Sequence, residues 1–267
     1  MVVSKSDVLV SNKAQRVLLW ISLAMYGFFG LGLVVFMRFF PPPAPTLSIP
    51  EVVAVYTRNL PMFQTGVVMC LIGSAVLLPW SLVIYAQMTR LERGFPILSI
   101  LQLLAGALGT IFMWFPPMLW GYAAFTVTRD PAMAMGAHQF GWLMMVVPVV
   151  VWPMQLVPIG IIALTKTEDD RYSAFPRWLG YATILFAIEP MVELGAIVFK
   201  TGPVAWNGVL SWWVPMFMWF PWMLALTISI FKSIKHQEAL LDVLRPGSMT
   251  PTFLGTTLGG KSIGVAS

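Results

Sequence analysis

Two glutamates, Glu189 and Glu193, lie in the middle of an apolar run, Trp178 to Phe199, that is long enough to cross a lipid bilayer. No other carboxylate falls inside a candidate span. A charged side chain in hydrocarbon costs roughly 2.5 to 3.5 kcal/mol on insertion scales, so such residues usually face the interior of a helix bundle. No lysine or arginine lies in a hydrocarbon segment to pair with them, so at least one is expected to be protonated. The pair therefore predicts a proton or cation site.

The spacing of the two glutamates places both carboxyls on one wall of the span. Four residues of an ideal α-helix turn through about 400 degrees, so the two side chains point the same way, one turn apart. Pro190 follows Glu189 and cannot donate to the carbonyl of Phe186, which predicts a kink and a free carbonyl beside the acids. A structural role stays open, because a protonated glutamate could donate a hydrogen bond to Gln155, Gln102 or a free carbonyl and only hold helices together.

Prolines and aromatic residues form a second group of candidate site residues. Pro116, Pro190 and Pro221 are among the prolines inside the candidate spans, and each predicts a helix kink. Trp120, Trp212 and Trp213 fall near span ends, where an interfacial aromatic belt is expected. The deeper residues expected to line a pocket for an apolar or aromatic molecule are Trp114, Trp152, Gln155 and Trp219. Ordinary packing in a lipid-like interior is the alternative for each tryptophan.

The composition identifies the class of protein that must hold these residues. Of 267 residues, 58% are hydrophobic and 10% are charged, and the mean hydropathy is +0.80, well outside the balance of soluble domains. Nearly unbroken apolar stretches, such as Val146 to Leu156, exclude the alternating strands of a membrane barrel. Each span needs roughly 20 apolar residues, and we place six, at about 17–37, 62–87, 96–121, 140–164, 178–199 and 206–231. The sequence therefore predicts an all-α fold, a polytopic membrane bundle of six transmembrane helices.

Basic residues in the connections set the expected orientation. One set of connections, with the two chain ends, carries 12 of the 16 lysines and arginines, and the opposite set carries 4, namely Arg38, Arg58, Arg129 and Lys200. By the positive-inside rule, both termini are expected to be cytoplasmic. The net charge of +5 then reflects topology and attraction to anionic lipid headgroups, and no nucleic-acid partner is expected.

The chain is expected to form one transmembrane domain over residues 1–244, followed by a disordered cytoplasmic tail over residues 245–267. Ser48 and Glu51 have the spacing of a capping box, which predicts a short helix near 48–59 on the outer side. Its apolar residues suit either the membrane interface or a lid packed on the bundle.

Few residues suited to metal or nucleophilic chemistry are present. A second helix start at Asp130 and Pro131 precedes His138, which we place in an outer loop, and His236 is cytoplasmic. Cys70, the one cysteine, lies inside a span. The sequence therefore predicts no metal site and no catalytic residue, and it identifies no cofactor. An isomerase that uses the two glutamates as an acid pair stays as the enzymatic alternative.

Two further function classes stay open. In the first, kinked helices enclose a mid-membrane pocket, and Glu189 and Glu193 link the transport or binding of a small apolar or aromatic solute to protons or cations. In the second, the chain is a non-catalytic subunit of a larger complex that packs against membrane proteins, pigment, lipid or further copies of itself. The two classes differ in whether the Glu189 face points into the bundle or toward another chain.

One segment, Phe199-Lys200-Thr201-Gly202-Pro203-Val204-Ala205-Trp206-Asn207-Gly208, resembles a segment of an uncharacterised family of bacterial multi-pass inner-membrane proteins. The resemblance covers the last third of the chain. It implies a location in the bacterial inner membrane and transfers no activity.

Overall fold

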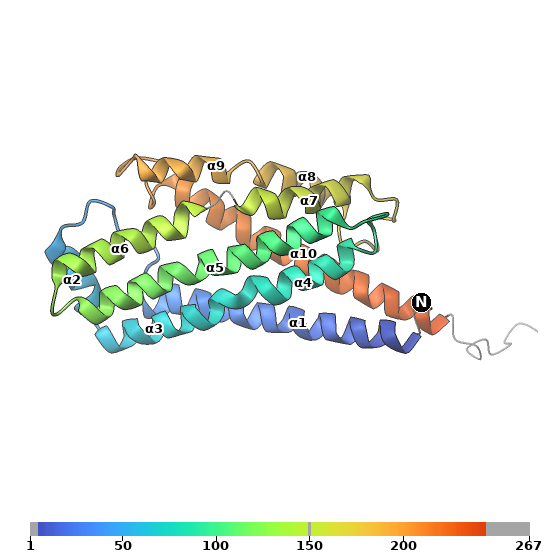
Figure 1. Cartoon of the computed structure of the whole chain (residues 1–267), viewed down its shortest axis with the longest axis horizontal. Coiled ribbons are helices and arrows are strands. Elements are labelled where there is room, and N and C mark those ends of the chain that lie inside the picture. The colour runs from blue at the N-terminus through green and yellow to red at the C-terminus, as the bar shows by residue number, and fades with distance from the viewer. Residues whose placement is uncertain (1–4, 149–150, 244–267) are drawn as a thin grey trace, which may run out of the picture.

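The computed structural model describes residues 5–148 and 151–243 (Figure 1). All regular elements within these residues are helical. Six stretches are long and apolar enough to cross a membrane, namely Ser11–Phe36, Leu60–Met88, Ile97–Thr126, Pro131–Thr165, Arg177–Ile197 and Val209–Leu241. The predicted all-α, multi-pass class is thereby confirmed. The tail predicted over residues 245–267 lies outside the described residues.

Most spans are built from more than one helical element. The first span holds α1 (Lys5–Leu31) and a π-helical turn (Gly32–Phe36), and α2 (Ile49–Thr57) follows it. The second holds α3 (Leu60–Gly73), a 3-10 turn (Ser74–Val76) and α4 (Leu77–Met88), and the third is α5 (Ile97–Thr126). The fourth holds α6 (Pro131–Val146) and α7 (Val151–Thr165). The fifth holds α8 (Arg177–Phe186), α9 (Pro190–Glu193) and a 3-10 turn (Leu194–Ile197), and the sixth holds a π-helical turn (Val209–Trp213) and α10 (Val214–Val243).

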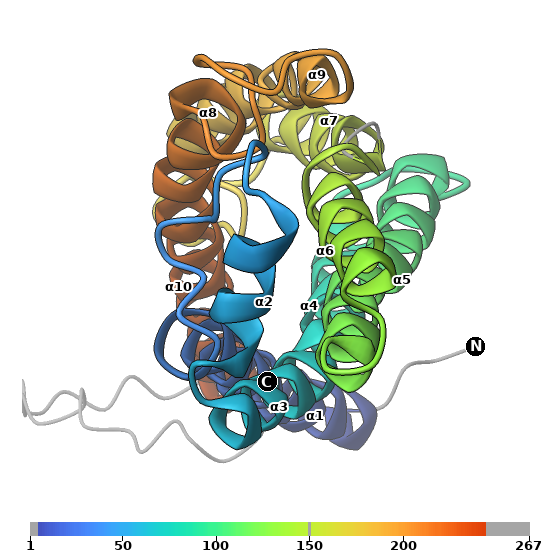
Figure 2. The same ribbon diagram turned by 90° about the vertical axis from the view of Figure 1, so that its left-hand side faces the viewer.

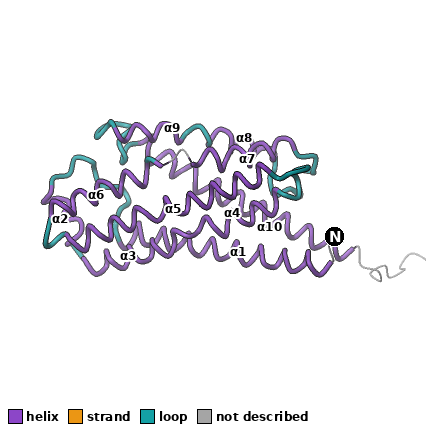
Figure 3. Tube along the Cα trace, viewed as in Figure 1, coloured by secondary structure: helices purple, strands orange, loops and turns teal. Residues whose placement is uncertain are grey.

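The six spans form a ring in chain order (Figure 2). The second span packs on α1, α5 packs on α4, α6 and α7 pack on α5, α8 packs on α7, and α10 closes the ring by packing on both α8 and α1. Both ends of the described chain lie at one end of the ring, here called the terminal end, and α2 lies at the opposite end, the α2 end (Figure 1). Most of the irregular connections lie at these two ends (Figure 3).

Glycines allow the first two spans to approach each other at backbone distance. A Cβ added at Gly73 would lie 2.5 Å from the backbone nitrogen of Phe29 and 2.6 Å from the carbonyl oxygen of Met25. A Cβ added at Gly66 would lie 2.9 Å from the carbonyl oxygen of Gly32. Small residues at helix crossings provide the van der Waals contact that drives association where lipid removes the hydrophobic effect. This crossing therefore fixes one side of the ring.

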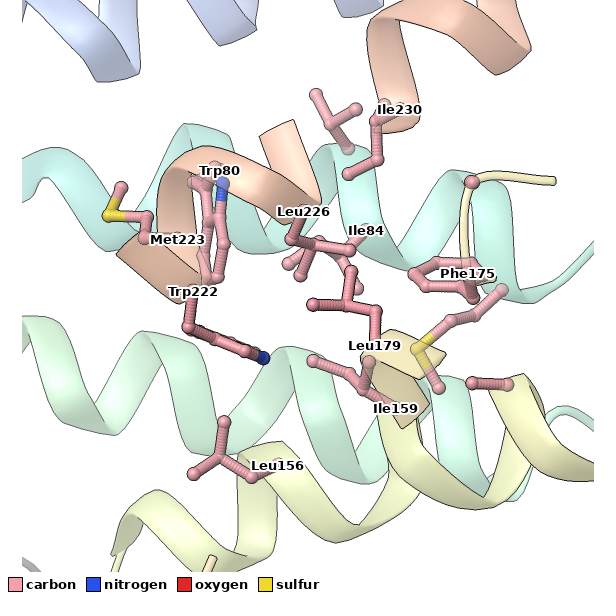
Figure 4. Packing of buried hydrophobic residues seen from close by; sticks show 14 of the residues in the cluster. Trp80, Ile84, Leu156, Ile159, Phe175, Leu179, Trp222, Met223, Leu226 and Ile230 are labelled. Carbon is pink, nitrogen blue, oxygen red and sulfur yellow. The ribbon is translucent and has the colours of Figure 1, made fainter. Parts of the chain in front are cut away.

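The terminal half of the ring interior is filled by side chains. Trp80 and Ile84 of α4 meet Leu226 and Ile230 of α10, and all four are fully buried (Figure 4). The Trp80 indole N–H donates to the Thr227 hydroxyl at 3.0 Å, which satisfies the buried donor. Three amide side chains join α1, α4 and α10 beyond this core: Gln87 Nε2 donates to Gln15 Oε1 at 2.6 Å, and Gln237 Nε2 donates to Gln87 Oε1 at 3.0 Å.

A second cluster fills the α2 end. Phe39 is fully buried, with ring centroids 5.1 Å from Trp120, 5.2 Å from Phe63 and 5.2 Å from Trp142. The Trp142 ring lies 5.4 Å from that of Trp212. The assignment of Trp120 and Trp212 to an interfacial belt is wrong, because both side chains turn into the ring and are buried.

Helix α2 lies over this cluster. Its first turn is held by the Ser48 backbone N–H, which donates to the Glu51 carboxylate at 2.7 Å, and this contact with Ser48 lowers the pKa of Glu51. Val52 and Tyr56 are fully buried against the bundle. The Tyr56 hydroxyl lies 3.0 Å from Nδ1 of His138.

The placement of His138 in an outer loop is wrong. The Asp130 side chain accepts a hydrogen bond from the Met133 backbone N–H, and Pro131 occupies the first turn, so α6 begins before His138 and carries it into the buried cluster.

Substitution of Gly73 by alanine is expected to lower the free energy of unfolding by about 1–3 kcal/mol, because the new Cβ overlaps backbone atoms that cannot move aside. The matched control is Gly27→Ala in α1, where a Cβ meets no atom within 4 Å and alanine favours the helix by roughly 0.5–1 kcal/mol. Thermal unfolding in detergent measures both. Equal midpoints for the two variants would contradict the close helix contact.

Candidate functional site

The fifth span is interrupted beside the acidic pair. Helix α8 ends at Phe186 and α9 begins at Pro190. Pro190 has no N–H to donate to the preceding turn, and the backbone tightens around it: the Val192 N–H donates to the Glu189 carbonyl, three residues back, at 3.0 Å. By contrast, α5 continues through Pro116 and α10 continues through Pro221. The two glutamates therefore lie on an irregular segment and not on a regular helix.

The two carboxyls interact with each other. Glu193 is buried, with 6% of its surface exposed. Both carboxyl oxygens of Glu189 are shielded from solvent, and in the described part of the chain they meet no hydrogen-bond donor apart from the neighbouring carboxyl. The ion pairs found among residues 5–148 and 151–243 involve other acids, Asp169, Asp170 and Glu238. The pair is thus without a basic partner there.

Glu193 lines a cavity of about 410 Å³ inside the ring. All six spans contribute to its wall, which is mostly apolar and aromatic. Ser74 and Ser211 also line it, but their hydroxyls donate to backbone carbonyls at 2.7 and 2.9 Å. The Tyr26 hydroxyl and the Trp212 indole N–H are buried and have no hydrogen-bond partner in the described residues. The described residues of the wall include no lysine, arginine or histidine.

Indole rings form one side of the cavity. The ring centroids of Trp152 and Trp219 lie 5.1 Å apart, and Phe186 packs 5.7 Å from Trp219. Trp222 lies 5.3 Å from Trp219, and its indole N–H donates to the Thr183 hydroxyl at 2.7 Å. These contacts hold the rings of α7, α8 and α10 in place, so the aromatic wall is preorganised.

The cavity is covered at both ends of the ring and open at its side. On α10, the lining residues extend as far as Met223. Leu226, about one turn further along the helix, is fully buried in the core of the terminal half. The aromatic cluster around Phe39 covers the α2 end. Between the first and sixth spans, Val34 and Phe217 both line the cavity and are exposed, Phe217 by 72%. The opening therefore faces the surroundings of the ring.

Contacts on either side bound this opening. Toward the terminal end, the rings of Tyr26 and Phe220 lie 4.8 Å apart. Toward the α2 end, Phe40 packs 5.2 Å from Trp213. The opening is a window between two contacts and not a complete separation of α1 from α10.

The structure brings together only some of the residues that the sequence singled out. Trp152, Trp219 and Glu193 line the same cavity. Trp114 is 52% exposed and points away from the ring. Gln155 is fully buried outside the cavity, where its amide donates to the Ser81 hydroxyl at 2.9 Å. No hydrogen bond joins Gln155 or Gln102 to the acidic pair in the described residues.

The periodicity of the sequence gives no signal for several lining residues. Tyr26, Phe29 and Met113 belong to helices that are apolar on nearly all sides, so periodicity could not show which face points inward. The unusual polarity of a tyrosine within the first span was the one cue that could have singled out Tyr26. The remaining lining residues become visible only once the ring is assembled.

No grouping of three or more histidine, cysteine, aspartate or glutamate residues suited to a metal ion occurs within the described ranges. Comparison with known proteins gives no match to a family model, to a curated protein or to a solved structure. The resemblance of Phe199–Gly208 to a bacterial family therefore stays a prediction.

Carboxyl infrared spectroscopy in native-like lipid tests the state of the acidic pair. We expect a protonated carboxyl band at neutral pH that the double variant Glu189→Gln/Glu193→Gln removes, because an unpaired charge in an apolar cavity is costly. The control is Glu51→Gln, the same change at an exposed capping position that glutamine can also fill. A band that survives in the double variant Glu189→Gln/Glu193→Gln, or no protonated band in the parent, would contradict a protonated pair.

Proposed function

We propose that this chain binds, and by means of its acidic pair transports, a small apolar or aromatic solute within the membrane, in a process linked to protons or cations. The observation that carries the proposal is the position of Glu193, which lines a mostly apolar cavity of about 410 Å³ with no basic partner among the described residues. Small-molecule sites are typically clefts of roughly 300–1,000 Å³ with few polar groups. An ionisable residue inside a membrane protein is by default a functional-site hypothesis.

The direction of the acidic face favours this function over a complex subunit. A subunit that used the pair to contact a partner would present it on the outside of the ring. Glu193 instead lines the interior, and the Glu189 oxygens are shielded from solvent. The outward aromatic residues, such as Trp114, are accounted for by contact with lipid.

We further propose that the terminal end faces the cytoplasm and that the membrane is the bacterial inner membrane. The connections at residues 89–96 and 166–176, together with the chain ends, carry the excess of lysine and arginine. The bacterial assignment rests on the resemblance of Phe199–Gly208. With this orientation, the α2 end and its aromatic cluster lie on the outer side.

Binding can be tested with bromobenzene, a neutral aromatic solute whose bromine quenches tryptophan fluorescence. We expect saturable quenching of purified protein, because Trp152, Trp212 and Trp219 line the cavity. Gly30→Leu should weaken this binding at least tenfold, since Gly30 lines the cavity and a Cβ there meets no atom within 4 Å, leaving the side chain free to occupy the space.

The matched control is Gly27→Leu in the same helix. Gly27 is exposed, does not line the cavity and is equally unobstructed, so this variant should bind bromobenzene like the parent. Identical, non-saturable quenching in the parent and both variants would contradict a binding cavity.

A further inference from the structure

The charge of the cavity wall restricts what it can accept. From α9, Glu193 lines the cavity and Glu189 lies beside it, and α1 contributes Tyr26. The described lining residues of α4, α5, α6, α7 and α10 contribute no titratable or charged group. His138 of α6 lies away from this wall, paired with Tyr56 at the α2 end. Among the described residues, a bound anion would meet only acidic groups, whereas a monovalent cation would meet a carboxylate with no other counter-ion.

The polar groups of the wall are too few for an inorganic cation. Hard metal ions are held by roughly six or more oxygens or by retained water. Here the Ser74 and Ser211 hydroxyls are already engaged with backbone carbonyls. Among the described lining residues, the side-chain oxygens left are those of Glu193 and Tyr26, too few to replace a hydration shell. An organic cation whose charge is surrounded by apolar groups does not need a replacement for a hydration shell.

The aromatic wall suits an organic cation. The faces of indole and phenol rings attract ammonium-type cations, and the interaction reaches about 2 kcal/mol or more when the groups are desolvated. Trp152, Trp212, Trp219 and Tyr26 all line the cavity beside Glu193. A carboxylate in a cavity lined by aromatic rings is a combination suited to quaternary and aryl-substituted ammonium groups.

The side opening fits the same class of ligand. The window between α1 and α10 is framed by exposed apolar residues, Val34, Phe40, Phe217 and Phe220, and it faces the bilayer if the six spans cross it. A lipophilic cation concentrates in the membrane interface and can reach the cavity sideways. A hydrophilic solute would require an aqueous path through one of the two filled ends of the ring.

We infer that the cavity binds a lipophilic monovalent organic cation, which arrives from the lipid between α1 and α10 and displaces a proton from the Glu189–Glu193 pair. This inference rests on the proposed binding function and narrows its ligand. In the exchange, one carboxyl loses its proton to bulk water and becomes the counter-ion of the cation. The charge of the cavity is therefore unchanged, which avoids burying an uncompensated charge.

An isosteric pair of probes separates charge from shape. 4-Bromobenzyltrimethylammonium and 1-bromo-4-neopentylbenzene differ in one atom, nitrogen or carbon, and both quench tryptophan. We expect the cation to bind at least tenfold more tightly at pH 8, to release about one proton per molecule bound, and to gain affinity by up to about tenfold per pH unit while the pair is protonated. The neutral probe should show neither proton release nor pH dependence.

Variants assign the effect to the pair. Glu193→Gln should remove the preference for the cation and the proton release while keeping the affinity for the neutral probe, and Glu51→Gln should leave both unchanged. If the neutral probe binds as tightly as the cation in the parent, with no proton released, the cation inference is wrong and the binding function stands. If neither probe saturates and Gly30→Leu behaves like Gly27→Leu, the binding function itself fails.

Discussion

Two carboxyl groups with no basic partner in the described part of the chain must be kept out of the hydrocarbon, and the arrangement of the six helices meets that constraint. An isolated charge in a low-dielectric interior is so costly that the group must be neutralised, paired or hydrated. The ring provides a cavity of about 410 Å³ at Glu193 and shields Glu189 behind it. The break in the fifth span at Pro190 makes this segment irregular, and the two carboxyls interact there.

The cavity lies between two packed ends of the ring, each filled by its own cluster of side chains. Apolar side chains, Trp80 and Ile230 among them, fill the terminal half, and a hydrogen bond between Gln87 and Gln15 joins its helices. Aromatic rings around Phe39 fill the α2 end. Backbone contact at Gly73 holds the first two spans together, so the ring cannot collapse inward there. The opening lies between the first and sixth spans, bounded by the Tyr26–Phe220 contact on one side and the Phe40–Trp213 contact on the other.

The sequence is sufficient to predict the class of fold and the location of the acidic pair. Long apolar runs and the absence of intramembrane basic residues are composition signals, and they do not depend on how helices pack. The N-cap of α2 at Ser48 and the irregularity at Pro190 can be predicted from local chemistry, whereas Pro116 and Pro221 give the same cue and lie within continuous helices. Whether a side chain points into the ring or away from it cannot be predicted in this way. Trp114 and Trp219 occupy the same position in two identical five-residue segments, residues 112–116 and 217–221, yet one points away from the ring and the other lines the cavity.

That difference has a physical cause. In a soluble helix, polar residues mark the face that meets water, but here lipid accepts the same residues as the protein interior. Which face of α5 or α10 points into the ring is therefore determined only by packing against the neighbouring helices. The misplacement of His138 arose differently, because the helix start at Asp130 was recognised but its continuation into the span was not.

Reaction with dicyclohexylcarbodiimide, which modifies protonated carboxyls in apolar surroundings, tests the central claim most directly. Peptide mapping by mass spectrometry would locate the adduct in protein held in lipid at several pH values. A neutral acidic site inside the ring predicts modification at Glu193 that declines as the pH rises, with surface acids such as Glu51 and Asp169 left unmodified. Absence of modification at Glu193 at every pH, or equal reaction at the surface acids, would contradict it.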